Sequence, residues 1–174
     1  MSGARRIALL GGESSGKSTL AAALAARLDT VWVEEYGREL WVKRDGALDF
    51  EDLLHIGEVQ VIREDKAAPR ARGFLFCDTT PLVTVFYSRA LFGRVDPRLE
   101  TLAARRYDHS LLCAPDFPFV QDGWREDAAF RQAQHDFYRE ELDRMGQAYT
   151  LIDGPLDQRI GKAIAALAPA RGDG

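Results

Sequence analysis

Asparagine is absent from the 174 residues of the sequence, and lysine is scarce. The lack of asparagine excludes the N-K-x-D motif with which GTPases recognise guanine. The four lysines are Lys17, Lys43, Lys66 and Lys162, so most of the positive charge comes from arginine. Because lysine is rare here, the place of each lysine in the pattern is informative, above all that of Lys17.

Long apolar runs and clusters of cysteine or histidine are also missing. No apolar run approaches the roughly 20 residues that a membrane-spanning helix needs, so membrane insertion is not expected. The two cysteines, Cys77 and Cys113, stand far apart in apolar stretches and are predicted to be buried, reduced thiols. The N-terminal residues run directly into an apolar strand pattern and leave no room for a signal peptide. Together these features predict a cytoplasmic location.

The composition is that of a soluble globular domain. Hydrophobic residues make up 46% and charged residues 29%, and the length suits one domain with a sizeable core. The net charge of −4 argues against a nucleic-acid-binding surface, which usually carries a basic stripe. The oligomeric state is left open by the sequence.

Strand and helix patterns alternate along the chain. Strands are predicted over 7–10, 30–34, 74–78, 109–114 and 148–153, and helices over 18–28, 49–68, 81–91, 97–107, 126–145 and 155–167. This alternation predicts an α/β fold in which a five-stranded parallel sheet carries helices on both faces. One domain is expected over residues 1–168, followed by a disordered tail over 169–174. In the helix over 126–145, the residues expected to face the core are Phe130, Ala133, Phe137 and Leu142.

The stretch from Ile7 to Leu20 matches the G-x-x-x-x-G-K-[ST] phosphate loop in its required setting of strand, loop and helix. Its glycines let consecutive backbone N–H groups turn towards phosphate oxygens, and the following helix adds the positive end of its dipole. Lys17 is predicted to reach the β- and γ-phosphates, and the Ser18 hydroxyl to hold Mg²⁺. The residues expected to bind ATP here are Gly12, Glu13, Ser14, Ser15, Gly16, Lys17, Ser18 and Thr19.

Two further strands end in acidic residues, at the edge of a parallel sheet where ligands gather. Glu35 follows the second strand and is the preferred candidate to face the ligand, with Glu34 as the alternative. Asp78 ends the third strand in the Walker B arrangement and is expected near the bound Mg²⁺. Thr80 is predicted to cap the next helix, which leaves Asp78 available for ligand binding.

After the fourth strand, two prolines and a glycine over residues 115–125 exclude a continuous helix. Five strands leave little room for the additional motifs of larger ATPases, so a small kinase is favoured. Kinases of this kind cover the transferred phosphoryl group with a lid that carries arginines. We expect the lid over residues 115–131, with Arg125 as a catalytic residue and Arg131 as an ATP ligand.

Four blocks of the sequence resemble the ribosylnicotinamide kinase domain of bacterial NadR proteins. They are G-E-S-S-G-K-S-T, E-Y-G-R-E, D-T-T-P, and the block Y-D-x-x-L-L-C-A-P-D-x-P-F-V-x-D-G-W-R, whose second half is the most specific. The resemblance runs from Ile7 to Ile160 and implies a stand-alone kinase that converts nicotinamide riboside and ATP, with Mg²⁺, to nicotinamide mononucleotide and ADP. The DNA-binding and adenylyltransferase domains of longer NadR proteins have no counterpart in the sequence, so neither of those roles is expected.

The implied reaction defines an acceptor site at the ends of the second and third strands. Glu35 or Asp78 would hold the 5′-hydroxyl of the riboside or take its proton; Glu35 is preferred, and Asp78 would be shared between Mg²⁺ and the sugar. Because an aromatic face attracts the flat nicotinamide cation, aromatic residues complete the expected site. The substrate-binding candidates are Glu35, Tyr36, Arg38, Trp41, Asp78, Tyr87 and Trp124.

Other assignments stay open at this point. Gly154 and Pro155, after the fifth strand, are expected to contact adenine, as the corresponding loop does in small P-loop kinases. A kinase of the same fold for another nucleoside or a vitamin is the nearest alternative. A non-catalytic, ATP-binding regulatory module is a second alternative of a different class.

Overall fold

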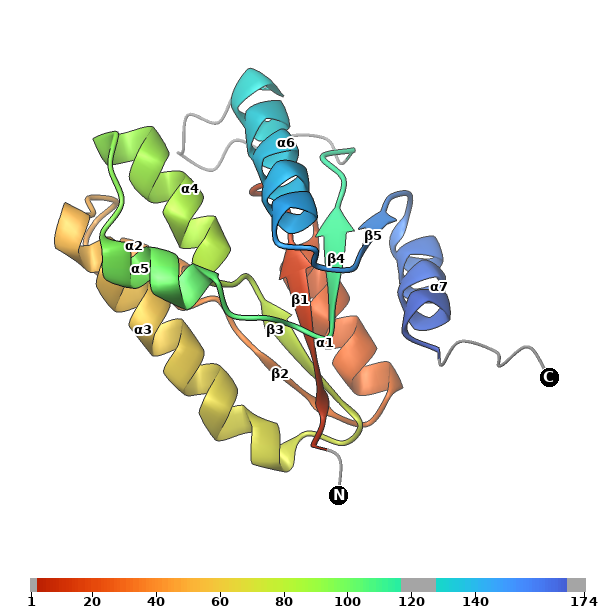
Figure 1. The fold of residues 1–174 in the computed structure, drawn as a ribbon. Coiled ribbons are helices and arrows are strands. Elements are labelled where there is room, and N and C mark those ends of the chain that lie inside the picture. The colour runs from red at the N-terminus through yellow and green to blue at the C-terminus, as the bar shows by residue number, and fades with distance from the viewer. Residues whose placement is uncertain (1–2, 117–127, 169–174) are drawn as a thin grey trace.

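A five-stranded parallel sheet forms the centre of the protein (Figure 1). The computed structural model describes residues 3–116 and 128–168. The strands are β1 (Arg5–Leu10), β2 (Val31–Val33), β3 (Phe74–Asp78), β4 (His109–Cys113) and β5 (Tyr149–Ile152). They lie in the order β2-β3-β1-β4-β5, and every neighbouring pair is parallel. The predicted sheet is confirmed.

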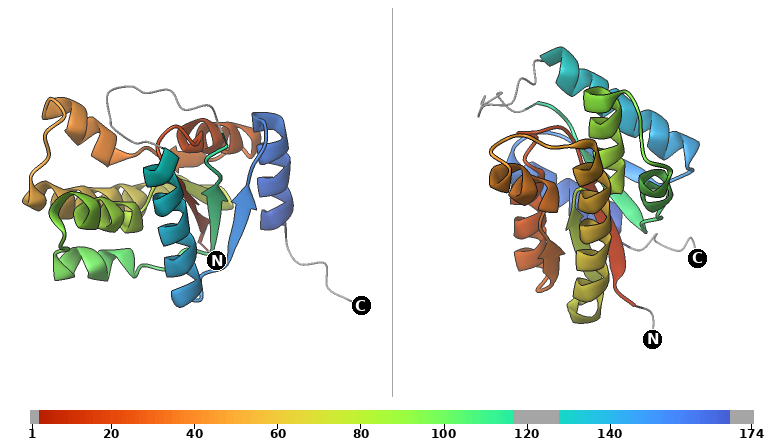
Figure 2. Two further views of the ribbon diagram at one scale, coloured as in Figure 1. Left: turned by 90° about the horizontal axis from the view of Figure 1, so that it is seen from above. Right: turned by 90° about the vertical axis from the view of Figure 1, so that its left-hand side faces the viewer.

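Helices cover both faces of this sheet (Figure 2). They are α1 (Lys17–Arg27), α2 (Tyr36–Lys43), α3 (Phe50–Ala67), α4 (Pro81–Phe92), α5 (Pro97–Ala103), α6 (Ala128–Arg144) and α7 (Leu156–Leu167), with a 3₁₀ turn at Ala68–Arg70. α1 and α7 pack on Ile7 and Leu9 of β1, whereas α4 and α6 pack against Leu10 on the opposite face. Because both faces of the sheet are covered, β1 is apolar along its whole core segment.

Local capping signals place several helix boundaries as predicted. The Thr80 hydroxyl accepts a hydrogen bond from the backbone N–H of Leu82, which confirms the expected cap of α4. Asp49 and Asp52 form a capping box at the start of α3. Among the described residues, no helix combines the length and the apolar character required to cross a membrane.

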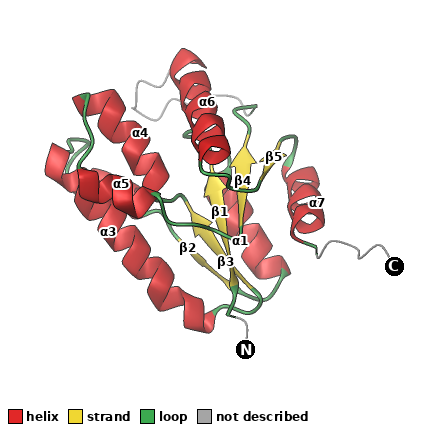
Figure 3. Ribbon diagram, viewed as in Figure 1, coloured by secondary structure: helices red, strands yellow, loops and turns green. Residues whose placement is uncertain are grey.

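Two helices differ from the sequence prediction (Figure 3). No helix was expected directly after β2, yet α2 occupies eight residues there and includes Gly37. Its only buried residue is Leu40, which packs into a cluster with Leu53 of α3, so tertiary packing stabilises a segment with little helical pattern of its own. α5 ends at Ala103, earlier than expected.

The core-facing side of α6 is confirmed for Phe130 and Phe137, which pack against Phe86, and for Leu142, which is buried. Ala133 was expected to face the core, and it is exposed. The buried residues of this helix are Arg131, Gln134, His135, Tyr138 and Leu142. Because apolar spacing carries no signal for polar residues, it did not identify Arg131, Gln134 and His135 as buried.

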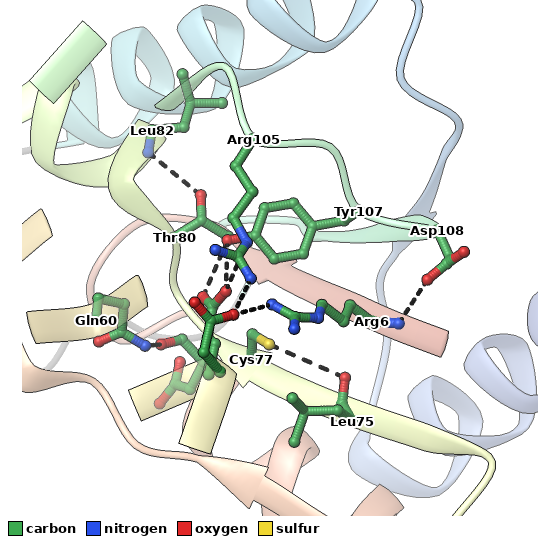
Figure 4. Close-up of polar contacts among 12 residues, drawn as sticks. Arg6, Gln60, Leu75, Cys77, Thr80, Leu82, Arg105, Tyr107 and Asp108 are labelled. Atoms are coloured by element: carbon green, nitrogen blue, oxygen red, sulfur yellow. Dashed lines mark hydrogen bonds and ion pairs between the residues drawn. The ribbon is translucent and has the colours of Figure 1, made fainter. Parts of the chain in front are cut away.

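A buried carboxylate joins α3 to the segment that precedes β4. Glu64 is fully buried and accepts hydrogen bonds from the Tyr107 hydroxyl at 2.9 and 3.1 Å. The Arg105 Nε atom lies 3.4 Å from the same carboxylate, and Figure 4 shows Arg105, Tyr107 and Arg6 converging beside Cys77. Burial raises the pKa of Glu64 to about 8, although the Tyr107 hydrogen bond opposes that shift.

The pKa of Glu64 predicts how stability depends on pH. Between its ordinary pKa of 4.5 and its folded value of about 8, the native state binds more protons than the unfolded chain, so stability falls as the pH rises. Glu64→Gln keeps a neutral hydrogen-bonding group and should be more stable than the wild type at pH 8. At pH 5 the two proteins should differ little. Urea unfolding across this range measures the effect.

Glu58→Gln provides the matched control, because Glu58 is an exposed glutamate on the same helix. It should keep the pH dependence of the wild type. An unchanged slope in Glu64→Gln would show that the buried carboxylate does not cause the loss of stability.

Candidate active site

One pocket of about 320 Å³ opens at the carboxyl ends of the central strands. In parallel sheets this edge is where ligands bind, because the loops that follow neighbouring strands diverge there. Part of the pocket wall is polar and comes from the phosphate loop. Most of the remainder comes from α2, α3 and α4, with Gln134 of α6 and a few loop residues completing it. The lining residues are Gly11, Glu13–Thr19, Glu35, Gly37, Arg38, Trp41, Leu48, Leu53, Ile56, Gln60, Thr79, Val83, Thr84, Tyr87, Leu91 and Gln134.

The phosphate loop has the backbone conformation that its glycines predict. Gly16 adopts a left-handed conformation, φ 80°, and is the N-cap of α1. Gly11 has φ 149°, and a Cβ atom there would lie 2.9 Å from the carbonyl oxygen of Cys113, so a side chain would collide with β4. The Lys17 Nζ atom donates to the Gly12 carbonyl oxygen at 2.9 Å. This contact holds the ammonium group over the loop.

Ser18 and Asp78 meet at the start of α1. The Ser18 hydroxyl donates to Asp78 Oδ2 at 2.5 Å, although the two residues lie 60 positions apart. Asp78 is almost fully buried, and its Oδ1 atom has no hydrogen-bond partner among the described residues. A hydroxyl and a carboxylate with spare acceptor capacity form an oxygen donor set of the kind that Mg²⁺ prefers. The two predicted metal ligands therefore lie together and fit the ion.

Asp78 does not line the pocket, whereas Glu35 does. The pKa of Glu35 is raised to about 7, chiefly by burial, against the lowering effect of Lys17; the charge of Asp78 also raises it, and Arg38 lowers it. Burial also raises the pKa of Asp78, against the lowering effects of Lys17 and of the Ser18 hydrogen bond. The structure thus separates two acids that the sequence could not distinguish. Glu35 faces the open space, and Asp78 faces Ser18. Glu34, the alternative, is exposed.

The aromatic candidates are divided between the pocket and its surroundings. Trp41 and Tyr87 line the pocket together with Arg38, which lies 3.9 Å from Glu13 of the phosphate loop. Tyr36 does not line it. The Tyr36 hydroxyl is 3.1 Å from the Nε2 atom of His55, and the Arg63 guanidinium lies over its ring. Trp124 lies outside the described residues.

A buried arginine on α7 ties the phosphate loop to two other loops, and sequence reasoning missed it. Arg159 is fully buried, and its Nη1 atom donates to the Ser15 carbonyl oxygen at 2.8 Å. Its Nε atom donates to the Gly154 carbonyl oxygen at 2.7 Å, and its Nη2 atom pairs with Asp116. Gly154 in turn donates its N–H to Asp116 at 2.7 Å. Arg159 lies one helical turn after Pro155, in a helix that also carries apolar residues. That position was the signal in the sequence that could have indicated a buried arginine near the loop.

The remaining predicted ATP ligands lie around this framework. Gly154 is held beside the phosphate loop through Arg159, and Pro155 follows it as the N-cap of α7. Arg131 is buried at the start of α6, with its Cγ atom 3.9 Å from the position that a Cβ atom of Gly12 would take. Arg125 and most of the predicted lid, residues 117–127, lie outside the described residues.

Comparisons with known proteins agree with this geometry. A family model described as "AAA domain" matches residues 6–159. The trifunctional NAD biosynthesis/regulator protein NadR of Salmonella typhimurium is 36% identical over 128 residues, which is 70% of this chain and 31% of that protein. The corresponding protein of Escherichia coli is 37% identical over the same length. The chain therefore spans about a third of the curated relatives that it matches. The resemblance seen in the motifs is confirmed.

Solved structures share the fold. A NadR protein in complex with NR superimposes with a TM-score of 0.80 at 24% identity, covering 94% of this chain and 50% of that one. Thymidylate kinase from Ehrlichia chaffeensis gives a TM-score of 0.71 at 16% identity, covering 96% of this chain and all of the other. The fold is thus that of small P-loop kinases, as predicted.

The contacts of Arg159 predict that it stabilises the site. Arg159→Met removes the donor to two loop carbonyls and leaves Asp116 without its cation, so the free energy of unfolding should fall by about 2–5 kcal/mol. Arg144→Met is the control, because Arg144 is largely exposed in its pair with Glu141 and should contribute less than about 1 kcal/mol. Equal stability of the two variants in urea unfolding would contradict this assignment.

Proposed function

Because this chain belongs to the AAA-domain family and matches NadR proteins in sequence, we propose that it is a ribosylnicotinamide kinase. The reaction transfers the γ-phosphoryl group of ATP to the 5′-hydroxyl of nicotinamide riboside and yields nicotinamide mononucleotide and ADP. The observation that carries this proposal is a single pocket in which a phosphate loop and a pocket-facing carboxylate, Glu35, share one space. A site that only bound ATP would not need a carboxylate that faces the pocket.

The phosphate loop supplies the donor side of the reaction. Its backbone N–H groups and Lys17 would hold the β- and γ-phosphates, and the N-terminus of α1 adds its positive end. Mg²⁺ held by Ser18 and Asp78 would neutralise part of the phosphate charge. Arg131, and Arg125 in the segment that is not described, are the proposed arginine contacts to phosphate. Gly154 and Pro155 are the proposed contacts to adenine.

Glu35 supplies the acceptor side. As a carboxylate it would accept the proton of the 5′-hydroxyl while the hydroxyl oxygen forms a bond to the γ-phosphorus. The bond from that phosphorus to the β,γ-bridging oxygen breaks, and its electron pair leaves with ADP. With a pKa of about 7, Glu35 is partly ionised at neutral pH and is well matched to proton transfer in this range.

The wall beyond Glu35 suits a flat cationic ring. Trp41 and Tyr87 line it with apolar residues of α3 and α4, so an aromatic face is available to the nicotinamide by cation–π attraction. Arg38 also lines this wall and is available to the ribose. Tyr36 is directed to His55 and Arg63 in this structure, so its place in the site stays a proposal, as does that of Trp124.

An acceptor panel tests the proposal directly. ADP release should rise above the ATP-only background with nicotinamide riboside, and more than with thymidine, deoxyadenosine or a vitamin alcohol. Lys17→Ala should lower that rate by orders of magnitude while leaving the fold intact by circular dichroism, because it removes the cation that meets the transferred phosphoryl group. A higher rate with another acceptor would overturn the substrate, and turnover unchanged in Lys17→Ala would overturn the mechanism.

The pH profile tests the role of Glu35. Its pKa is raised to about 7, so the protonated form dominates below that pH and cannot accept a proton. The value of kcat/KM for the riboside should therefore rise as the pH increases through about 7 and level off roughly one pH unit above that value. Glu35→Gln should lower kcat by about 10²–10⁴-fold and abolish the rise. The exposed neighbour variant Glu34→Gln should keep the wild-type profile; a profile that persists in Glu35→Gln would assign the base to another group.

A further inference from the structure

Gln134 of α6 is a buried amide in the wall of the pocket. It is 1% exposed, and the sequence pattern did not single it out. Its Nε2 atom donates to the Tyr138 hydroxyl at 2.7 Å, while its Oε1 atom has no hydrogen-bond partner among the described residues. A buried acceptor without a donor destabilises the fold, so its retention beside a ligand site calls for a partner there.

The free end of this amide lies at the phosphate loop. Gln134 Oε1 is 2.9 Å from the position that a Cβ atom on Gly12 would occupy. The amide therefore fits against the loop only because residue 12 has no side chain. The Gly12 carbonyl oxygen accepts the ammonium of Lys17 at 2.9 Å. Since this lysine is the one that reaches the β- and γ-phosphates in phosphate loops, the amide borders the same volume.

The amide can present a donor to that volume. The Tyr138 hydroxyl can donate as well as accept, so rotation of the Gln134 amide by half a turn preserves a hydrogen bond between the two side chains. In that orientation Oε1 accepts from Tyr138 and the NH₂ group points to the loop. Phosphate oxygens only accept hydrogen bonds, so they select this orientation over the one in which Oε1 faces them.

We propose that Gln134 is a catalytic residue that donates a hydrogen bond from its side-chain amide to the γ-phosphoryl group of bound ATP. The inference rests on the proposed transfer from ATP and names a contact that the phosphate loop motif does not contain. Because the donor meets the group that is transferred, it distinguishes ATP from ADP at the binding step and stabilises charge on the γ-phosphoryl oxygens during transfer.

Comparison of ATP and ADP affinities tests this contact without any acceptor. Gln134→Met preserves the length of the side chain and removes the donor. By isothermal titration with Mg²⁺ present, it should bind ATP about 10–100-fold more weakly than the wild type, whereas its affinity for ADP should change less than about twofold. Gln132→Met is the control, because Gln132 lies on the same helix and is exposed.

A second variant guards against a folding defect. Gln134→Glu keeps the size and an acceptor for the Tyr138 hydroxyl, and at pH 8 it replaces the NH₂ donor by a carboxylate oxygen. It should weaken ATP binding at least as much as Gln134→Met, again with ADP spared. An equal loss for both nucleotides, or no loss for ATP, would overturn the assignment. Because these titrations need no riboside, failure of the acceptor panel alone would leave the Gln134 contact supported.

Discussion

The charge of Lys17, which acts on the carboxylates of both Glu35 and Asp78, is the interaction on which the site depends. Its ammonium is held at the Gly12 carbonyl oxygen, and it lowers the pKa of both Glu35 and Asp78 against the effect of burial. In a low-dielectric pocket, one cation offsets only part of the charge of two acids, and the pKa of both acids stays raised. A triphosphate with Mg²⁺ adds both signs of charge to this arrangement, so donor binding and the ionisation of Glu35 are coupled.

The order of the strands brings these groups together. β1 lies between β3 and β4, so the phosphate loop leaves the sheet next to the end of β3, where Asp78 stands. Arg159 then fixes the loop from the other side through the Ser15 carbonyl oxygen. Lys17 follows a loop that is held by hydrogen bonds at the Gly12 and Ser15 carbonyl oxygens. Because both bonds are buried, they oppose small displacements of the loop more strongly than solvent-exposed bonds would.

The sequence predicts the donor half of the site better than the acceptor half, for a physical reason. A phosphate loop is a contiguous backbone motif, so spacing alone specifies Gly11, Gly16 and Lys17, and the strand pattern specifies the sheet. The acceptor half is assembled from α2, α3 and α4, and depends on how these helices pack. α2 itself was missed because Gly37 and a single buried leucine give it almost no periodic signal. In the structure Glu35 lines the pocket, whereas its neighbour Tyr36 does not, and the sequence did not distinguish these two positions.

Buried polar residues explain what the sequence could not predict elsewhere. Apolar periodicity identifies only the apolar part of a buried face, and α6 and α7 also bury Arg131, Gln134 and Arg159. Burial of such groups is stable only when each has a partner, and for Arg159 these partners are backbone carbonyls and a distant acid, Asp116. None of these is visible in local spacing. Buried polar residues of α6 and α7 are therefore identified from the packing of these helices and not from the spacing of residues along the chain.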